Sequence, residues 1–453
     1  MKLRFRYLLV LTAAAGLLLA LTRGQAQQGH VPAGASISAS EGMQLASLNT
    51  RSGDAASLLG SALWPSANQT STGSSITSAP DATQGTAEAR LIGVYQLINA
   101  GRAQEALKSA TELVRDHPTF QLAQLIYGDL LSTQTRAVQT LGDIPGALND
   151  SKAKATLADL RQESEMRLKA LRERPPANTI PSQFLALSQR NRHAIAIDAS
   201  RSRLYLFENT PQQLRLVGDF YISVGKSGIE KMVEGDARTP LGVYFIVGNL
   251  DPKSLSDFYG SGALPINYPN VLDSRRGKTG SGIWLHGPPP NQFARAPMAS
   301  DGCVVLSNPD LEFIIRTVEV RTTPVVIAPR LDWVPQQRVQ AERKPFDDAL
   351  DAWRSVKSSG DVDRLMRFYT QDFSSRGRTL AEWAPALRKE VDKAQGRPIA
   401  LKDVSFLRWT DTADTMVVTF GEVTAGARTG PTKRQYWRRE GDEWKIFYEG
   451  IIG

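Results

Sequence analysis

The spacing of hydrophobic residues changes along this chain, and the changes divide it into regions that cannot share one type of fold. Between residues 86 and 175, apolar residues recur at intervals of three and four, which is the spacing of a helical face. Between residues 190 and 329 they alternate in short runs bounded by Gly and Pro, which is typical of strands. The chain has 453 residues, too many for one compact core. We therefore predict a multidomain protein in which a small α-helical segment precedes a mainly-β domain.

Residues 343–453 show a third pattern. Two helical faces come first, separated by Gly360. Alternating stretches follow, at Met416, Val418 and Phe420 and again at Trp444, Ile446 and Tyr448. Helices followed by a run of strands predict an α+β domain at this end of the sequence.

The first 26 residues have the layout of a secretory signal peptide. A basic start, which holds Lys2, Arg4 and Arg6, precedes a Leu- and Ala-rich apolar stretch, and small residues suit cleavage after Ala26. A retained membrane anchor is the alternative, because the apolar stretch is slightly long for a signal. In either case we expect the rest of the chain to lie outside the cytoplasm.

The two regions that follow differ in composition. Residues 27–85 are dominated by Ser, Ala, Gly, Thr and Gln, so we predict a disordered linker there. In the helical segment 86–175, the spacing of Gly101, Ala106 and Pro118 resembles one tetratricopeptide repeat. An ordinary helical hairpin is the favoured alternative, since stable arrays need about three repeats. The charged stretch from 151 to 174 is predicted to be a solvated helix.

Composition excludes several classes of site. The net charge of +8 falls to +4 without the four basic residues of the predicted signal, too weak an excess for a nucleic-acid binder. A single cysteine, Cys303, rules out an internal disulfide and a cysteine-based zinc cluster. With only four histidines, a histidine-rich metal site is not expected either, so we predict neither metal nor cofactor.

The residues that carry chemistry lie between 281 and 308. A predicted strand ends at His286, and a second predicted strand begins at Cys303, 17 residues later. Neighbouring strand ends would bring the imidazole and the thiol within hydrogen-bond distance. Because an imidazole can take the proton of a thiol and stabilise the thiolate, we interpret His286 as the base and Cys303 as the nucleophile of an acyl transfer. The N–H groups of Gly302 and Cys303 are expected to face the developing oxyanion. The alternatives are a buried cysteine with a packing role and His193 as the base.

These residues resemble a known signature. His286-Gly287 followed by Ser300-Asp-Gly-Cys303 is similar to the motif of L,D-transpeptidases, the YkuD domain, and the stretch 235–244 is similar to a turn of that family. The resemblance covers residues 190–329. It implies a β-rich catalytic domain in which Cys303 attacks the carbonyl between diaminopimelate and D-Ala of a peptidoglycan stem peptide. The thioester then passes to an amine, giving a 3→3 crosslink, with His286 as general base.

Two departures from the family motif affect the expected roles. Asp301 stands where the motif has a second His, and Val305 where many members have Arg. Asp301 is expected either to support His286 or to be a turn residue. The other motif residues considered are Ser300 and Gly302 beside the nucleophile, Gly287 and Asn308 as substrate-binding residues, and Lys226 and Arg238 as cations for stem-peptide carboxylates.

The C-terminal region resembles a second family. The stretches around Trp353 and Tyr369 and the run from Tyr436 to Tyr448 are similar to the NTF2-like (SnoaL-like) cone fold, over residues 343–453. Cones of this kind often enclose a pocket. The aromatic residues Trp353, Tyr369, Trp409 and Trp437 are nevertheless predicted to be core rather than pocket lining.

Three functions remain open at this stage. The first is a periplasmic transpeptidase of peptidoglycan biosynthesis, with a role in cell-wall organisation and cell shape. The second is a hydrolase at diaminopimelate, either a carboxypeptidase or an enzyme that releases a wall-bound lipoprotein. The third is a non-catalytic wall-binding scaffold that meets a partner through its helical or NTF2-like domain.

Overall fold

The computed structural model describes residues 83–143, 150–394 and 396–452. The predicted signal peptide and nearly all of the predicted linker lie outside these ranges. At the end of that linker, β1 (Thr83–Gln84) pairs in parallel with β6 (Leu214–Tyr221). None of the helices in the described ranges has the length and apolar character that crossing a bilayer requires.

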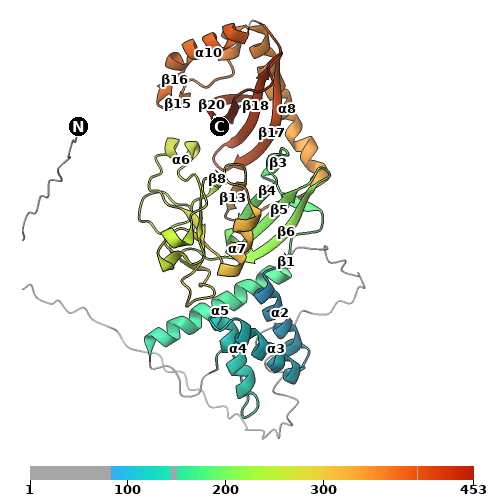
Figure 1. Cartoon of the computed structure of the whole chain (residues 1–453), viewed down its shortest axis with the longest axis vertical. Coiled ribbons are helices and arrows are strands. Elements are labelled where there is room, and N and C mark those ends of the chain that lie inside the picture. The colour runs from blue at the N-terminus through green and yellow to red at the C-terminus, as the bar shows by residue number, and fades with distance from the viewer. Residues whose placement is uncertain (1–82, 144–149, 395, 453) are drawn as a thin grey trace, which may run out of the picture. The chain divides into compact units, whose positions relative to one another are not determined.

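In its described residues the helical segment forms four helices, which are labelled in Figure 1. They are α2 (Thr86–Asn99), α3 (Ala103–Asp116), α4 (Gln121–Ser132) and α5 (Ser151–Arg172). The predicted face of α2 is buried at every position: Leu91, Val94, Tyr95 and Ile98. After α2, Gly101 has a positive φ of 70°, a conformation that glycine adopts without strain. The sequence pattern therefore predicted the helices of this segment correctly.

The charged helix α5 is solvated over most of its charges, as predicted, since Lys152, Lys154, Asp159, Arg161 and Glu165 are exposed. The prediction fails at Glu163 and Arg167, which are buried and paired with each other at 2.7 Å. Arg167 also pairs with Glu88 of α2 at 2.9 Å, and Glu88 pairs with Arg203 at 2.8 Å. Arg203 begins β5 and contacts Asp219 of β6 at 2.5 Å. These charges connect the helical segment to the domain that follows.

The central domain, residues 190–329, is built on a six-stranded sheet. Across the sheet the strands are β1, β6, β5 (Arg203–Asn209), β4 (His193–Asp198), β13 (Pro324–Ala328) and β8 (Gly242–Phe245). The middle strands β4 and β13 pair in parallel and are buried on both faces, which explains their nearly continuous apolar sequences. Alternate residues of these strands therefore serve two different cores.

One face of the sheet packs inside the central domain and the other packs against the C-terminal domain. The internal core includes Ile195, Ile197, Leu204, Leu206, Val325 and Ile327. The second core includes Ala194, Ala196, Tyr205, Phe207, Val326 and Ala328, together with C-terminal residues such as Phe346 and Trp437. The two domains thus share the second core, which lies on the face of the sheet opposite the internal core.

Smaller elements complete the central domain. A three-stranded sheet has the order β12 (Val304–Val305), β10 (Trp284–His286) and β9 (Ala263–Pro265). A two-stranded sheet joins β11 (Met298–Ser300) to β7 (Val224–Gly225). The helices are α6 (Val271–Arg275) and α7 (Asn308–Thr317), with the short turns η1 (Ala199–Arg201), η2 (Pro252–Ser254) and η3 (Asp257–Tyr259).

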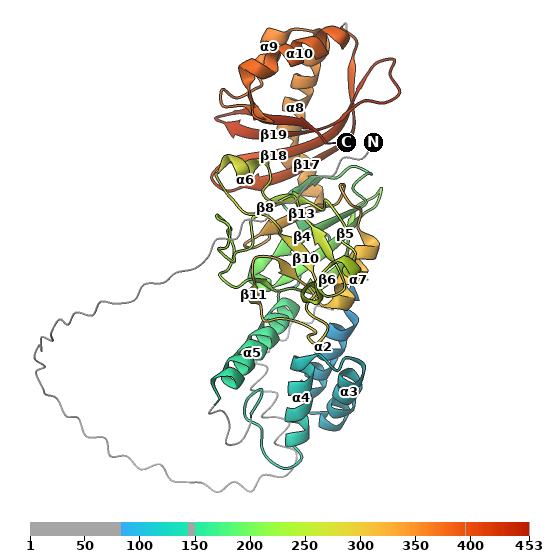
Figure 2. The ribbon, with the colours of Figure 1, turned by 60° about the vertical axis from the view of Figure 1, so that its left-hand side comes forward.

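The C-terminal domain is the predicted α+β unit. Figure 2 shows its helices on one face of a sheet. The helices are α8 (Gln336–Ser359), α9 (Val362–Met366) and α10 (Leu380–Ala394). The strands are β17 (Ile399–Thr410), β18 (Asp414–Thr424), β19 (Thr432–Glu440) and β20 (Glu443–Ile451), and β15 (Ser374–Ser375) and β16 (Arg378–Thr379) form a hairpin. The aromatic residues predicted as core are all buried.

Chain segments from before the central domain enter the C-terminal domain. The strand β3 (Phe184–Ala186) pairs with β17 and becomes the fifth strand of the C-terminal sheet. Next to it, β2 (Thr179–Pro181) pairs with β14 (Trp333–Pro335), which leads into α8. The sequence pattern did not predict either pairing.

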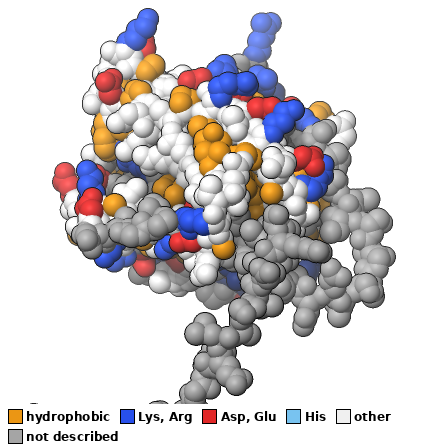
Figure 3. Space-filling model, turned by 90° about the horizontal axis from the view of Figure 1, so that it is seen from below, with side chains coloured by type: hydrophobic (Ala, Val, Ile, Leu, Met, Phe, Trp, Pro, Cys, Tyr) orange, Lys and Arg blue, Asp and Glu red, His pale blue; other side chains and the backbone are white. Residues whose placement is uncertain are grey.

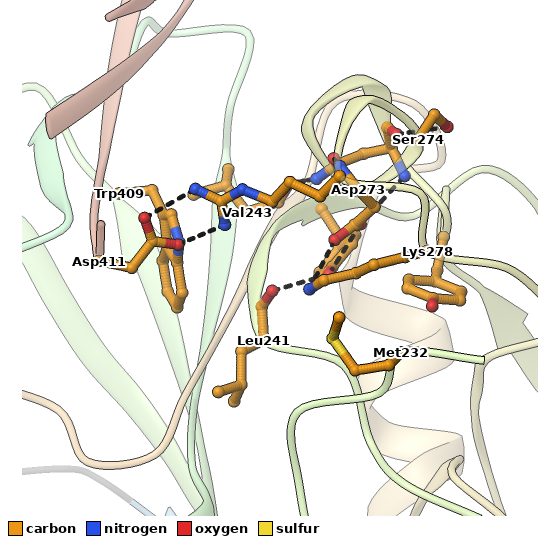
Figure 4. Close-up of polar contacts among 12 residues, drawn as sticks. Met232, Leu241, Val243, Asp273, Ser274, Lys278, Trp409 and Asp411 are labelled. Carbon is orange, nitrogen blue, oxygen red and sulfur yellow. Dashed lines mark hydrogen bonds and ion pairs between the residues drawn. The ribbon is translucent and has the colours of Figure 1, made fainter. Parts of the chain in front are cut away.

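Polar contacts reinforce this interface at α6, as Figure 4 shows for Asp411 and Trp409. Arg276, just after α6, donates two hydrogen bonds to Asp411, at 2.5 and 2.7 Å, and Trp409 donates to the same carboxylate at 2.6 Å. Within the central domain, Asp273 accepts from Tyr244 at 3.0 Å and pairs with Lys278 at 3.1 Å. The C-terminal domain is therefore fixed to the segment that leads into β10.

On the face drawn in Figure 3, basic and acidic side chains are interspersed with hydrophobic ones.

Candidate active site

The loop that carries Cys303 is closed by its own hydrogen bonds. The Ser300 hydroxyl donates to the Cys303 carbonyl at 2.6 Å and accepts from the Gly302 N–H at 3.1 Å. Gly302 has a φ of 120°, and a Cβ there would lie 2.7 Å from the Arg238 carbonyl oxygen. Glycine is required at this position because any side chain would be strained and would clash.

Thr239 supports this loop from a neighbouring segment. Its hydroxyl donates to the Gly302 carbonyl and accepts from the Gly225 N–H, both at 2.9 Å. The Lys226 N–H also donates to the Ser300 carbonyl at 2.7 Å. Thr239 belongs to the family-like stretch 235–244, but the motif alone did not identify its role.

His286 and Cys303 come from adjacent parallel strands. In the pairing of β10 with β12, Leu285 is opposite Val304 and His286 is opposite Val305. Leu285 and Val304 both point into the internal core. Because side chains alternate along a strand, His286 lies on the face opposite this core, and Cys303 directly precedes β12. The predicted adjacency of these two strands is therefore confirmed.

His286 is held in one tautomer. Its Nδ1 lies 2.7 Å from the Gly287 carbonyl oxygen, which can only accept, so Nδ1 carries the proton and Nε2 has the free lone pair. The side chain is only 1% exposed and contacts the rings of Tyr259 and Phe258, with centroid distances of 5.1 and 6.0 Å. Burial is the main cause that lowers the pKa of His286 to about 4, and the charge of Arg295 lowers it further.

Activity that uses His286 as a base is expected to persist to lower pH than an ordinary imidazole allows. Since the pKa is lowered from 6.5 to about 4, the imidazole stays neutral at moderately acid pH and is protonated only as the pH falls through that value. A profile of kcat/KM between about pH 3 and 8 should therefore show its acid limb near pH 4. An acid limb near 6.5 would contradict this assignment.

The Cys303 thiol lies against the backbone that precedes β10. Its Sγ is 3.5 Å from the Gly282 carbonyl oxygen, and the residue is half-buried. Burial raises the pKa of Cys303, whereas the Trp284 N–H and the charge of Arg295 lower it. The resting pair is therefore a neutral thiol and a neutral imidazole, which suits proton transfer to Nε2 as the thiol attacks.

Two predicted residues differ from expectation in their contacts. Asp301 pairs with Lys226 at 2.7 Å, with side chains 71% and 61% exposed, so its contact is with this cation and not with His286. Of the two N–H groups predicted to face an oxyanion, that of Gly302 donates instead to the Ser300 hydroxyl. The sequence could not show these local partners, because each depends on how the loop closes.

Asn308 and Gly287 form a tight contact below His286. Asn308 accepts from the Ser261 N–H at 2.8 Å and donates to the Pro288 carbonyl at 3.1 Å. A Cβ on Gly287 would lie 1.9 Å from the Asn308 side-chain oxygen. In the structure these predicted substrate-binding residues hold two loops together beside His286.

The remaining candidates are engaged elsewhere. Arg238 is exposed and donates to the Ile229 carbonyl at 2.9 Å. His193, the rival base, lies 3.1 Å from a carboxylate oxygen of Glu319 at the start of β4. Within the described ranges, no group of three or more His, Cys, Asp or Glu residues is arranged to hold a metal ion.

Two family models match this chain. Residues 192–327 match the L,D-transpeptidase catalytic domain, YkuD, and residues 346–450 match the Cds6 C-terminal NTF2-like domain. No curated protein sequence matches the chain.

Two solved structures are similar to this chain, and the first of them shares its fold. Bd1075 of Bdellovibrio bacteriovorus is 24% identical with a TM-score of 0.52, over 60% of this chain and 98% of that one. The helical cell shape determining protein Pgp2 of Campylobacter jejuni is 21% identical with a TM-score of 0.48, over 64% of this chain and 99% of that one.

Both His286 and Cys303 lie within the matched residues 192–327. A YkuD domain implies peptidoglycan as the class of substrate. The described chain therefore combines an L,D-transpeptidase (YkuD) catalytic domain with a C-terminal NTF2-like domain of the Cds6 type.

Proposed function

We propose that the protein is a peptidoglycan L,D-transpeptidase with Cys303 as nucleophile and His286 as general base. The proposal is supported by the parallel pairing of β10, which ends at His286, with β12, which directly follows Cys303. It is also supported by the contact of Nδ1 with the Gly287 carbonyl, which leaves Nε2 of the imidazole free. The YkuD match over the same residues supports the substrate class.

The proposed reaction has two acyl-transfer steps. The Cys303 Sγ attacks the carbonyl between diaminopimelate and D-Ala while His286 Nε2 takes the thiol proton. The amide bond then breaks, and the same proton passes to the departing amine of D-Ala, leaving a thioester on Cys303. An acceptor amine attacks the thioester and gives its proton to His286, so that a 3→3 crosslink forms and the thiol is restored.

Hydrolysis at diaminopimelate is the second candidate. It uses the same thioester, with water in place of the acceptor amine. Asp301, which stands where the family motif carries a second His, forms an exposed ion pair with Lys226, so the charge beside Cys303 differs from that of the motif. The bond cleaved would join diaminopimelate to D-Ala or to a wall-linked lipoprotein.

We also propose that the protein acts in the periplasm. The support is the signal-like layout of residues 1–26, whether the segment is cleaved or retained as an anchor.

Purified protein and a Cys303→Ala variant, incubated with diaminopimelate-containing tetrapeptide muropeptides, distinguish these functions by mass spectrometry of the products. We expect a crosslinked dimer and free D-Ala from the native protein and neither from the variant. Tripeptide without dimer would identify a hydrolase. Binding of both proteins to muropeptides with no product from either would identify the scaffold function instead.

A further inference from the structure

The loop between β10 and β11 is held in place near its end, by contacts at Arg295 and Pro297. The Tyr221 hydroxyl donates to the Arg295 carbonyl, and the Val224 N–H donates to the Pro297 carbonyl, both at 2.9 Å. Two residues before Arg295, Phe293 is buried and stacks on Phe120 of the helical segment, with a centroid distance of 4.2 Å. The helical core therefore anchors the backbone from which Arg295 projects.

The Arg295 side chain points toward the active site. Its guanidinium carbon lies 4.6 Å from the ring centroid of Phe258, and that ring lies 6.0 Å from the ring of His286. Phe258 is 43% exposed, so this stack lies at the mouth of the site and not in its core. Stacking on an aromatic face orients a guanidinium while leaving its N–H edges available.

Arg295 is unlike the other cations near the nucleophile. Lys226 is paired with Asp301, and Lys231 is paired with Asp236 at 2.8 Å. The Arg295 guanidinium makes neither an ion pair nor a hydrogen bond with any residue in the part of the chain that the structure describes. It is half-buried, so its five N–H donors lack a full shell of water as well.

The charge of Arg295 reaches both reacting groups. It lowers the pKa of Cys303 against the effect of burial, and it adds to the burial that lowers the pKa of His286. A cation in this position favours a thiolate and disfavours an imidazolium. It would also attract a negatively charged group of the substrate to the side of the nucleophile.

We propose that Arg295 binds a carboxylate of the stem peptide and thereby places the scissile carbonyl at Cys303. This inference rests on the proposed function for the identity of the substrate. A guanidinium with free, oriented donors matches a carboxylate in a two-bond geometry.

Charge-selective alkylation tests the inference without any muropeptide. Because Cys303 is the only cysteine, the rates of its reaction with iodoacetate and with neutral iodoacetamide report on this site alone. Both reagents react with the thiolate, so the ratio of the iodoacetate rate to the iodoacetamide rate does not depend on the fraction of thiolate. The ratio therefore measures how strongly the site attracts a carboxylate. We expect Arg295→Gln to lower the ratio about 5- to 10-fold and Arg295→Lys to keep most of it.

The matched control is Arg316→Gln on α7, an exposed arginine paired with Glu312, for which no change in the ratio is expected. An unchanged ratio in Arg295→Gln, with the protein folded, would overturn the inference. So would an equal fall in the Arg316→Gln control.

Amidated substrates then identify which carboxylate is bound. With the native protein, amidation of either the D-Ala carboxylate or the free diaminopimelate carboxylate should lower kcat/KM about 10- to 100-fold, mainly through KM. With the unmodified substrate, Arg295→Gln should lower kcat/KM by the same factor as amidation does in the native protein. Amidation of the carboxylate that Arg295 binds should then cause no further fall in this variant. If each amidation lowers kcat/KM of Arg295→Gln by the same factor as it does in the native protein, Arg295 binds neither carboxylate. If no muropeptide reacts at all, the proposed function fails, while the alkylation ratio still decides the role of Arg295.

Discussion

Replacement of His286 by Gln is expected to lower kcat/KM with tetrapeptide muropeptides by about 10²- to 10⁴-fold. Gln has no basic nitrogen, so the thiol proton would have no acceptor at the position of Nε2. The buried pocket between Tyr259 and Phe258 offers no other titratable imidazole among the described residues. The measurement is D-Ala release over time, with folding checked by circular dichroism.

The matched control is His193→Gln. This histidine is also largely buried, but it pairs with Glu319 at the start of β4, so its loss should leave kcat/KM within a few-fold of the native value. The pH profile adds a second readout, because the acid limb near pH 4 should disappear in His286→Gln and remain in the control. A larger loss in His193→Gln than in His286→Gln would reverse the assignment of the base.

Replacement of Glu88 by Ala is expected to destabilise the protein by about 3–5 kcal/mol. Burial alone would raise the pKa of Glu88, but Arg203 and Arg167 outweigh that effect and hold the pKa below its usual range. Without this carboxylate, each guanidinium keeps one buried ion-pair partner among the described residues. Arg167 keeps Glu163, and Arg203 keeps Asp219. The measurement is denaturant unfolding, followed by hydrogen exchange in α2 and α5, where protection should fall most.

The control is Glu105→Ala on α3. Glu105 also pairs with an arginine, Arg102, but the pair is exposed, so the midpoint of unfolding should not change measurably. If Glu88→Ala unfolds at the same denaturant concentration as Glu105→Ala, the buried cluster contributes no net stability to the interface.

Local patterns predicted much of this structure because they reflect contacts close in sequence. The helical face of α2 and the alternation in β4 and β13 are properties of the elements themselves. The pairing of β10 with β12 also follows from two short strands that lie close together in the sequence.

The features that sequence reasoning missed depend on distant partners. Arg167 looks like a surface residue in a charged helix until Glu88, 79 positions earlier, is brought against it. Arg295 looks like an ordinary loop residue until Phe258 lies beneath it. Charge and spacing alone do not encode such partners, since tertiary packing decides which charges are buried.

The pairing of β3 with β17 has a consequence for the order in which the chain is made. The backbone N–H of Ser188, just after β3, donates a hydrogen bond to the hydroxyl of Ser405, which lies 217 residues further along the chain. During synthesis the catalytic part therefore emerges with one strand edge open and one sheet face uncovered, and both wait for the last quarter of the polypeptide. A stop codon before that quarter would leave the edge unpaired and the face uncovered, so the YkuD domain depends on the C-terminal domain to complete its fold.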